Sequence, residues 1–409
     1  MVSETPALVS RSVRATELRI ISGVSAAHFL SHFYFLLLPP VFLWVRAEYG
    51  VSYTELGLAI TIFNAVSAVF QTPAGILADR VGAYTVLIAG LALEAVAFAL
   101  VGLVNSYWFL VAMFAVAGLA NTVFHPADYA LLSHHIAKER VCSAFSFHTF
   151  SGMLGNSVAP ATVLMLTALV GWRGAFIAAG LMGLGVVAVL LWQREDYTDS
   201  PHLRAREANA KPGTDWGLLM SAPILRSLIF FAALAAINVG VQNYSVVALN
   251  AANNTTPEVG NTALTGYMLM AAVGVLTGGL FVNRMSHHGL FAAAGIGLSC
   301  VIIAVIGFAD FNTAMLIFVM CASGFLGGII MPSRDMIVRE VTPPGQFGTV
   351  FGFVTTGFNV AGVLFPLIFG AIMDHGDPRS VFYLSAACGI VAVASVLSVR
   401  RKPRRSVAA

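Results

Sequence analysis

Long apolar runs separated by short polar segments extend along almost the whole chain. Twelve of these runs are long enough to cross about 30 Å of hydrocarbon as a helix, which takes roughly 17–25 residues. They lie near residues 20–45, 54–77, 84–104, 107–131, 143–168, 174–193, 223–249, 262–282, 290–308, 313–333, 349–372 and 381–399. The runs are continuously apolar and do not alternate as barrel strands do, so they predict an all-α membrane protein with twelve transmembrane helices.

Composition and charge placement agree with this pattern. The chain is 58% hydrophobic and 10% charged, whereas soluble domains carry about 25% charged residues. With twelve spans, nineteen of the 22 lysines and arginines fall on the side of both termini, and only Arg46, Arg173 and Arg379 fall opposite. Positive residues favour the cytoplasmic side, so we expect both termini in the cytoplasm and a multi-pass protein of the cell inner (plasma) membrane. Lipid surrounds such a chain, no nucleic-acid partner is expected, and we expect a monomer.

The two halves of the chain are related by sequence across a polar segment, residues 196–216. Several residues recur at a displacement of 206: Gly118 and Gly324, Pro126 and Pro332, Phe145 and Phe351, Phe147 and Phe353, Pro160 and Pro366, Arg173 and Arg379, Phe176 and Phe382. Six spans per half give both halves the same orientation. The pattern predicts two parallel six-helix pseudo-repeats, residues 17–195 and 217–400, joined by a cytoplasmic linker, and transporters of this kind bind substrate between the halves.

The loop after the second run carries a short motif of Gly75, Asp79, Arg80 and Gly82. It resembles the signature of the major facilitator superfamily, which lies between spans two and three, although the basic pair that normally follows is missing. The resemblance implies the major facilitator fold and a conformational latch formed by these four residues. Glycine allows close helix approach, and the charged pair can bind neighbouring helix ends. A generic polar turn is the alternative.

In span five, Gly152, Gly155 and Pro160 resemble the glycine–proline signature of exporters in this superfamily, without its usual Gly-Pro pair. This resemblance favours efflux. A packing role is the alternative interpretation, because small residues at this spacing permit close helix contact and proline permits a bend.

Four histidines lie in spans one, four and five. The segments around His28, His32, His125 and His148 resemble the fosmidomycin-resistance branch of the superfamily, in which a histidine is followed four residues on by aspartate. Here His32 replaces that aspartate, and Asp128 follows the histidine–proline pair where that branch has glutamate. In the superfamily, spans one, four and five line the cavity of the first half, which implies that these histidines bind substrate or protons.

The residues themselves support the same hypothesis. His28 and His32 are four apart, so they share one face of span one, roughly 13–20 Å from Arg19 along the helix. Imidazole titrates near neutral pH and suits a proton relay. A histidine that is only hydrogen-bonded to a neighbouring helix is the alternative. A His-x-x-x-His pair can also hold a divalent ion, but such sites usually need a third ligand, so we expect no metal site and no cofactor.

Other polar residues are weaker candidates. Glu94, in span three, and Asp128 are possible coupling carboxylates, because a charge at such depth must be protonated, paired or hydrated; Asp128 could also pair with Lys138 or Arg140. Asn64, Asn238 and Asn359 are predicted to line the substrate path, although polar residues also join helices. Asp335 is expected in a cytoplasmic charge cluster with Arg334 and Arg339. No lysine or arginine lies in the middle of a span, which argues against a fixed cationic clamp for phosphate- or nitrate-like anions.

These observations predict a secondary active transporter that moves a small organic compound by alternating access, in proton-coupled efflux. Proton-coupled uptake of a metabolite or metal chelate is an alternative, and a transporter-like membrane sensor without flux is another. An enzyme is not expected, because the chain has no phosphate-binding loop, no Gly-x-Ser-x-Gly and no His-Glu-x-x-His.

Overall fold

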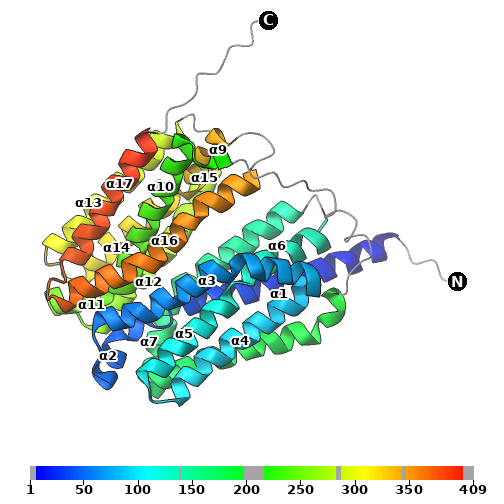
Figure 1. Cartoon of the computed structure of the whole chain (residues 1–409), viewed down its shortest axis with the longest axis horizontal. Coiled ribbons are helices and arrows are strands. Elements are labelled where there is room, and N and C mark those ends of the chain that lie inside the picture. Colours follow the sequence, from blue (N-terminus) through cyan, green and yellow to red (C-terminus); the bar gives the residue numbers. More distant parts are fainter. Residues whose placement is uncertain (1–5, 138–139, 198–215, 282–286, 343–346, 399–409) are drawn as a thin grey trace, which may run out of the picture. The chain divides into compact units, whose positions relative to one another are not determined.

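The computed structural model describes residues 6–137, 140–197, 216–281, 287–342 and 347–398, which form helices joined by turns (Figure 1). Eleven helical segments in these ranges are long and apolar enough to cross a membrane. One of them, Ala144–Trp192, contains Gly171, whose φ of 73° and ψ of 166° interrupt the helix. An apolar stretch lies on each side of this glycine, so the prediction of twelve spans is confirmed.

The described chain divides into two compact units. The first comprises residues 1–51 and 58–212. Its helices are α1 (Pro6–Phe35), α2 (Phe42–Tyr49), most of α3 (Tyr53–Val81), α4 (Ala83–Leu103), α5 (Tyr107–Asn121), α6 (Phe124–His135) and α7 (Val141–Trp192), with 3-10 turns at Pro39–Val41 and Arg194–Tyr197. Within this unit α7 packs along both α1 and α4.

The second unit comprises residues 52–57 and 213–409. Its helices are α9 (Trp216–Leu219), α10 (Ala222–Val239), α11 (Ser245–Asn253), α12 (Pro257–Phe281), α13 (His288–Phe308), α14 (Thr313–Ile329), α15 (Met331–Val341), α16 (Phe347–Asp374) and α17 (Ser380–Ser398). A π-helical turn, Gly240–Tyr244, joins α10 to α11. Helix α10 packs against α16 and α17, and α12 against α14.

The sequence repeat is also a repeat of local structure. Ser106 caps the amino end of α5 by accepting from the amide of Phe109 at 3.4 Å, and Asn312, 206 residues later, caps α14 by accepting from Met315 at 2.9 Å. Such caps satisfy amide groups that the first turn leaves without partners. The same helix therefore begins in the same way in each unit.

Close helix packing repeats as well. A methyl group on Gly118 would collide with the backbone of Phe63, and one on Gly324 would collide with the backbone of Tyr267. These two contacts hold α5 against α3 and α14 against α12. Only glycine lets the two backbones approach so closely.

The fourth span of each unit, α5 with α6 and α14 with α15, breaks near a proline. The first breaks between α5 and α6 at Thr122 and Val123, just before Pro126, and the second at Ile330, just before Pro332. Proline has no amide hydrogen and cannot continue the helical ladder. In the first unit the side-chain hydroxyl of Thr122, at the break, donates a hydrogen bond to the carbonyl of Leu119 at 2.6 Å. The break ends α5 and starts a new helix that carries His125 and Asp128.

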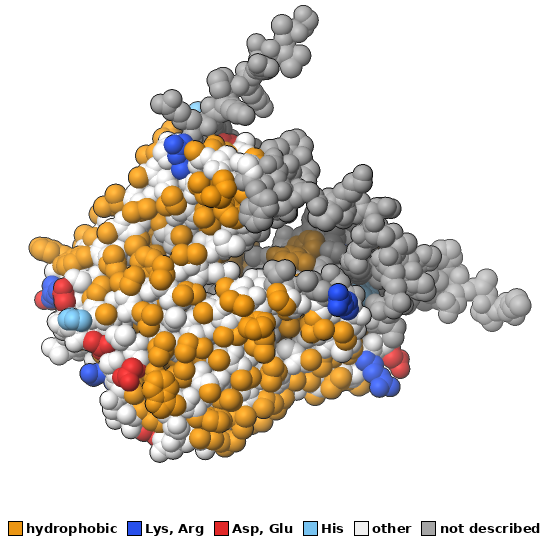
Figure 2. All heavy atoms as spheres, in the orientation of Figure 1, with side chains coloured by type: hydrophobic (Ala, Val, Ile, Leu, Met, Phe, Trp, Pro, Cys, Tyr) orange, Lys and Arg blue, Asp and Glu red, His pale blue; other side chains and the backbone are white. Residues whose placement is uncertain are grey.

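The outer surface is apolar, as lipid requires. Figure 2 shows hydrophobic side chains over much of the visible face, with the few charged groups gathered toward its margins. Leu169 and Phe308 are 73% and 76% exposed. A soluble protein rarely exposes contiguous apolar surface of this extent.

Charge pairs tie the segments at the two ends of α7 to α1. Arg140 donates to Glu17 at 2.7 and 2.8 Å, and Arg19 donates to both carboxylate oxygens of Asp196 at 2.7 Å. Arg140 was one predicted partner of Asp128, and it binds Glu17. The other, Lys138, lies outside the described residues.

Candidate functional site

A fully buried polar contact in the first unit joins α6 to α7. The Nε2 atom of His148 lies 2.9 Å from Oδ2 of Asp128, and the two side chains are 1% and 0% exposed. A carboxylate removed from water needs a partner of this kind, because burying it alone is costly. This pair is the centre of the candidate site.

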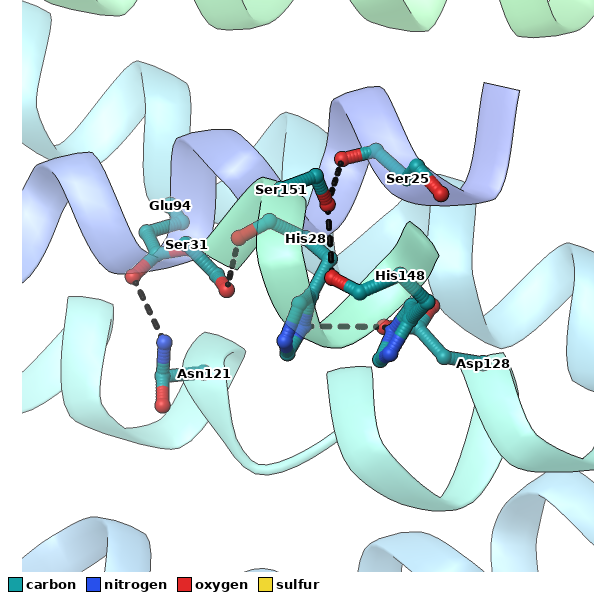
Figure 3. Close-up of polar contacts among 8 residues, drawn as sticks. All are labelled: Ser25, His28, Ser31, Glu94, Asn121, Asp128, His148 and Ser151. Atoms are coloured by element: carbon teal, nitrogen blue, oxygen red, sulfur yellow. Dashed lines mark hydrogen bonds and ion pairs between the residues drawn. The ribbon is translucent and has the colours of Figure 1, made fainter. Parts of the chain in front are cut away.

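His28 joins the pair from α1. Its ring stacks on that of His148, with centroids 3.7 Å apart and planes 22° from parallel. Its Nδ1 atom lies 3.3 Å from the same Asp128 oxygen, without the alignment of a hydrogen bond. Figure 3 shows the two imidazoles side by side, facing the aspartate. Three helices thus bring three titratable groups to one point.

His32 and His125 lie at the margin of this cluster. His32 is half-buried, its ring centroid is 4.6 Å from that of His28, and its Nδ1 is 2.9 Å from the amide nitrogen of Asn156. His125 is exposed, 5.3 Å from His28, and stacks on Tyr129 at 6.1 Å. The four predicted histidines therefore come together, from a buried centre to an accessible edge.

Small residues let α1 and α7 approach at this level. The hydroxyl of Ser151 donates to the carbonyls of Ser25 and His148, at 3.0 and 2.7 Å. The next residue, Gly152, leaves room for the imidazole of His28, and Asn156 follows one turn later on the same face of α7. Positions 148, 152 and 156 are each four apart, so they form one stripe of α7.

The cluster can hold and pass a cation. An imidazole and a carboxylate in hydrogen-bond contact share one proton, and neighbouring imidazoles offer the next positions for it. Asp128 Oδ1 and His148 Nδ1 are buried without a hydrogen-bond partner among the described residues. His28, Asp128 and His148 also present one ligand atom each within 4.8 Å, so the residues could alternatively hold a transition-metal ion.

Glu94 lies apart from the cluster. It is fully buried on α4, and one of its oxygens accepts a hydrogen bond from the side chain of Asn121 at 3.2 Å. Figure 3 places this pair on the far side of Ser31 from the imidazoles. The contact joins α4 to α5, and the predicted role of Glu94 in coupling stays a prediction.

The three predicted asparagines are not part of this cluster. Asn64 donates to the carbonyl of Ile60 in its own helix at 2.8 Å. Asn238 accepts from the hydroxyl of Tyr267 at 3.5 Å, and Asn359 is half-buried on α16; both belong to the second unit. Their predicted role as substrate contacts is not tested by these positions.

The predicted latch lies at the junction of α3 and α4. Gly82 has a φ of 103°, a conformation that side chains rarely adopt, and it sits directly before α4. Arg80 is exposed at the end of α3, and a methyl group on Gly75 would reach ordinary contact with Pro126, at 3.7 Å. The side chain of Asp79 lies outside the described residues. The glycine turn has a structural reason, and the latch itself stays a prediction.

Sequence reasoning missed three members of the site. Asn156, Ser151 and Tyr129 contact the histidines but were not among the predicted residues. The helical spacing of Asn156 from His148 could have identified it. Nothing in the sequence distinguishes Ser151 from other small residues in a span.

Two bundles with matching helices, a polar cluster inside the first and a lipid-compatible surface define a membrane transporter fold. The sequence model of the Major Facilitator Superfamily matches residues 24–249 and 228–409, and the chain belongs to this superfamily. Its members are transporters and not enzymes.

Curated relatives include a protein of Cupriavidus necator described as a probable sulfoacetate transporter, SauU, which is 26% identical over 382 residues and is matched over 86% of each chain. The D-galactonate transporter of Escherichia coli is 23% identical, covering 87% of this chain and 89% of its own. The multidrug efflux pump PmrA of Streptococcus pneumoniae is 23% identical, covering 81% and 82%.

Solved structures show the same fold. A bacterial homologue of the human lysosomal transporter Spinster, inward-facing and occupied, matches with a TM-score of 0.77 at 13% identity, over 94% of this chain and 98% of its own. The nucleoside transporter NupG matches with a TM-score of 0.77 at 14% identity, over 93% and 99%.

Proposed function

We propose that this protein moves a small organic compound across the inner membrane by alternating access, coupled to protons and in the direction of efflux. The observation that carries the coupling is the buried contact between His148 and Asp128, with His28 stacked on it. Three different helices bring these buried titratable groups together in the first unit.

The proposed mechanism requires the cluster to bind a proton differently in two conformations. Alternating access moves residues 17–195 against 217–400, with both termini in the cytoplasm. A proton can shift such an equilibrium only through its differential affinity for the two states. A small displacement of α1 from α6 would separate His28 from Asp128 and change how well the site holds a proton.

Relatives favour two substrate classes. PmrA is an efflux pump, and a further relative from Streptomyces glaucescens is a tetracenomycin C resistance and export protein. The sulfoacetate and galactonate transporters are named for organic acids, which favours transport of an organic acid as a second candidate. The finer resemblance to the fosmidomycin-resistance branch stays a prediction, as does transport of a metal chelate.

The test is substrate-dependent proton movement in proteoliposomes that contain a trapped pH dye, over a panel of drugs, organic acids and metal chelates. We expect at least one compound to drive proton movement in the wild type. Asp128→Asn and His148→Gln should abolish that movement, because each removes one partner of the buried pair. His375→Gln, an exposed histidine at the end of α16, should retain it.

Two results would contradict the proposal. Unchanged proton movement in Asp128→Asn would remove the cluster from the mechanism. Saturable binding without flux of any compound would favour the sensor alternative. Whether the driven proton moves opposite to the compound or with it separates efflux from uptake.

A further inference from the structure

A cation of the second unit packs against a pair of aromatic rings whose centroids are 5.1 Å apart. The guanidinium carbon of Arg334, on α15, lies 4.7 Å from the ring centre of Phe231 on α10 and 5.6 Å from that of Phe358 on α16. The side chain of Arg334 is only 18% exposed. Such contacts are attractive and offset part of the cost of removing the guanidinium from water.

The charge of Arg334 is only partly matched by protein. Its Nε and Nη2 atoms both lie 2.9 Å from a single oxygen of Asp335, whose side chain is 49% exposed. This is the predicted charge cluster in part. Among the described residues, no hydrogen-bond acceptor contacts Nη1. The N–H groups at the edge of a guanidinium bind planar or tetrahedral anions well.

The position of Arg334 in the repeat strengthens the inference. Arg334 lies 206 residues after Asp128, and Phe358 lies 206 after Gly152. In the first unit this place holds a carboxylate beside imidazoles, with a glycine to admit them. In the second unit it holds a guanidinium beside a phenyl ring. Equivalent positions of the two halves thus carry opposite charges and different neighbours.

We propose that Arg334 binds the anionic group, carboxylate or sulfonate, of the transported compound. The proposal rests on the proposed function and names the substrate class as organic anions. The sequence-based expectation argued against a fixed cationic clamp for phosphate- or nitrate-like anions in the middle of a span. Arg334 lies four residues beyond the break at Ile330, so counting from the ends of one continuous span placed it at the cytoplasmic surface.

The experiment is equilibrium binding to the purified full-length protein in detergent, measured by calorimetry. The probes are hexanoate, hexanesulfonate and gluconate, each compared with its uncharged amide. We expect the wild type to prefer acids to amides and Arg334→Gln to lose about tenfold or more of its acid affinity, as expected for a charged hydrogen bond. Arg334→Lys should be intermediate, because it keeps the charge and loses the planar fork.

Arg339→Gln is the matched control, since Arg339 is an exposed arginine of the same helix, and it should bind like the wild type. Equal binding of acids and amides, failure of the wild type to bind any acid, or unchanged acid binding in both Arg334 variants would overturn the inference. Phosphatidylglycerol that displaces the acids only when Arg334 is present, with no acid transported, would assign the site to lipid and also overturn it.

Failure of the proposed function is distinguishable from failure of this inference. Acid binding that depends on Arg334, in a protein that moves no proton in liposomes, would support the anion site and contradict proton coupling. Proton-coupled transport of neutral compounds alone would support proton coupling and contradict the anion site.

Discussion

Gly152 offers the sharpest test of how the histidine cluster is packed. A methyl group at this position of α7 would lie 2.7 Å from Nε2 and 2.8 Å from Cδ2 of His28, and 2.9 Å from Cδ2 of His32. Ordinary contacts begin at 3.4 Å, so the imidazole of His28 would have to move by about 0.7 Å. It has little room, because its other face stacks on His148 and its side chain is 4% exposed.

The expected loss of stability in Gly152→Ala follows from crowding in a filled interior. Forcing an extra methyl group into a packed site costs about 1–3 kcal/mol. Alanine is otherwise the better helix residue by roughly 0.8–1.0 kcal/mol. Gly185→Ala, in the helical stretch of α7 beyond the break at Gly171, places its methyl group with nothing within 4 Å and serves as the matched control. The difference between the two variants therefore isolates the crowding, at about 1–3 kcal/mol.

The assay is thermal unfolding of the two purified variants in detergent, followed by tryptophan fluorescence. We expect Gly152→Ala to unfold at a lower temperature than Gly185→Ala and the wild type, and to lose proton movement in liposomes, since His28 is displaced from Asp128. If Gly152→Ala unfolds at the same temperature as Gly185→Ala or above it, the packing of α1 on α7 described above is wrong.

Two further predictions concern charge pairs away from the cluster. Arg173 binds Glu48 and the carbonyl of Val104, and its repeat partner Arg379 binds Asp310 and the carbonyl of Phe308. Because Glu48 is 37% exposed and Asp310 75%, Arg173→Gln should destabilise by about 1 kcal/mol in thermal unfolding and Arg379→Gln by less; the reverse order would contradict this. The hydrogen bonds from Arg19 lower the pKa of Asp196, so its stabilising contribution is complete above the ordinary pKa and is lost as the pH falls through the lowered one. The stability difference between wild type and Asp196→Asn should therefore be largest at neutral pH and shrink below about pH 4, and a pH-independent difference would refute the pairing.

The membrane fold could be predicted from the sequence because its cause is uniform along the chain. Every span must be apolar over a fixed length, and the displacement of 206 residues repeats across separate segments. The shared face of His28 and His32 also follows from helical geometry alone. These features depend only on spacing within one helix or on the comparison of one half with the other.

Contacts between helices could not be predicted in the same way. Asp128 lies on α6, beyond the break before Pro126, and its partner His148 lies on another helix, α7, twenty residues away in the chain. From the sequence, Asp128 lies toward the cytoplasmic end of its span, and the next basic residues along the chain, Lys138 and Arg140, were its expected partners. Asn156 was not predicted as a site residue for a similar reason, because its partner His32 lies on another helix, α1. Which side of a helix faces a given neighbour depends on how the helix is rotated about its axis. The apolar composition of a span does not determine that rotation.

The two halves place different side chains on one repeated scaffold. The capped helix, the glycine contact and the break before proline are repeated at Ser106 and Asn312, at Gly118 and Gly324, and at Pro126 and Pro332. Two residues past each proline the repeat diverges, to Asp128 in one half and Arg334 in the other. Structural positions must be kept because each half needs the same packing, whereas a side chain beyond the break contacts only its local neighbours. A duplicated bundle can therefore assign proton binding to one half and anion binding to the other without changing its fold.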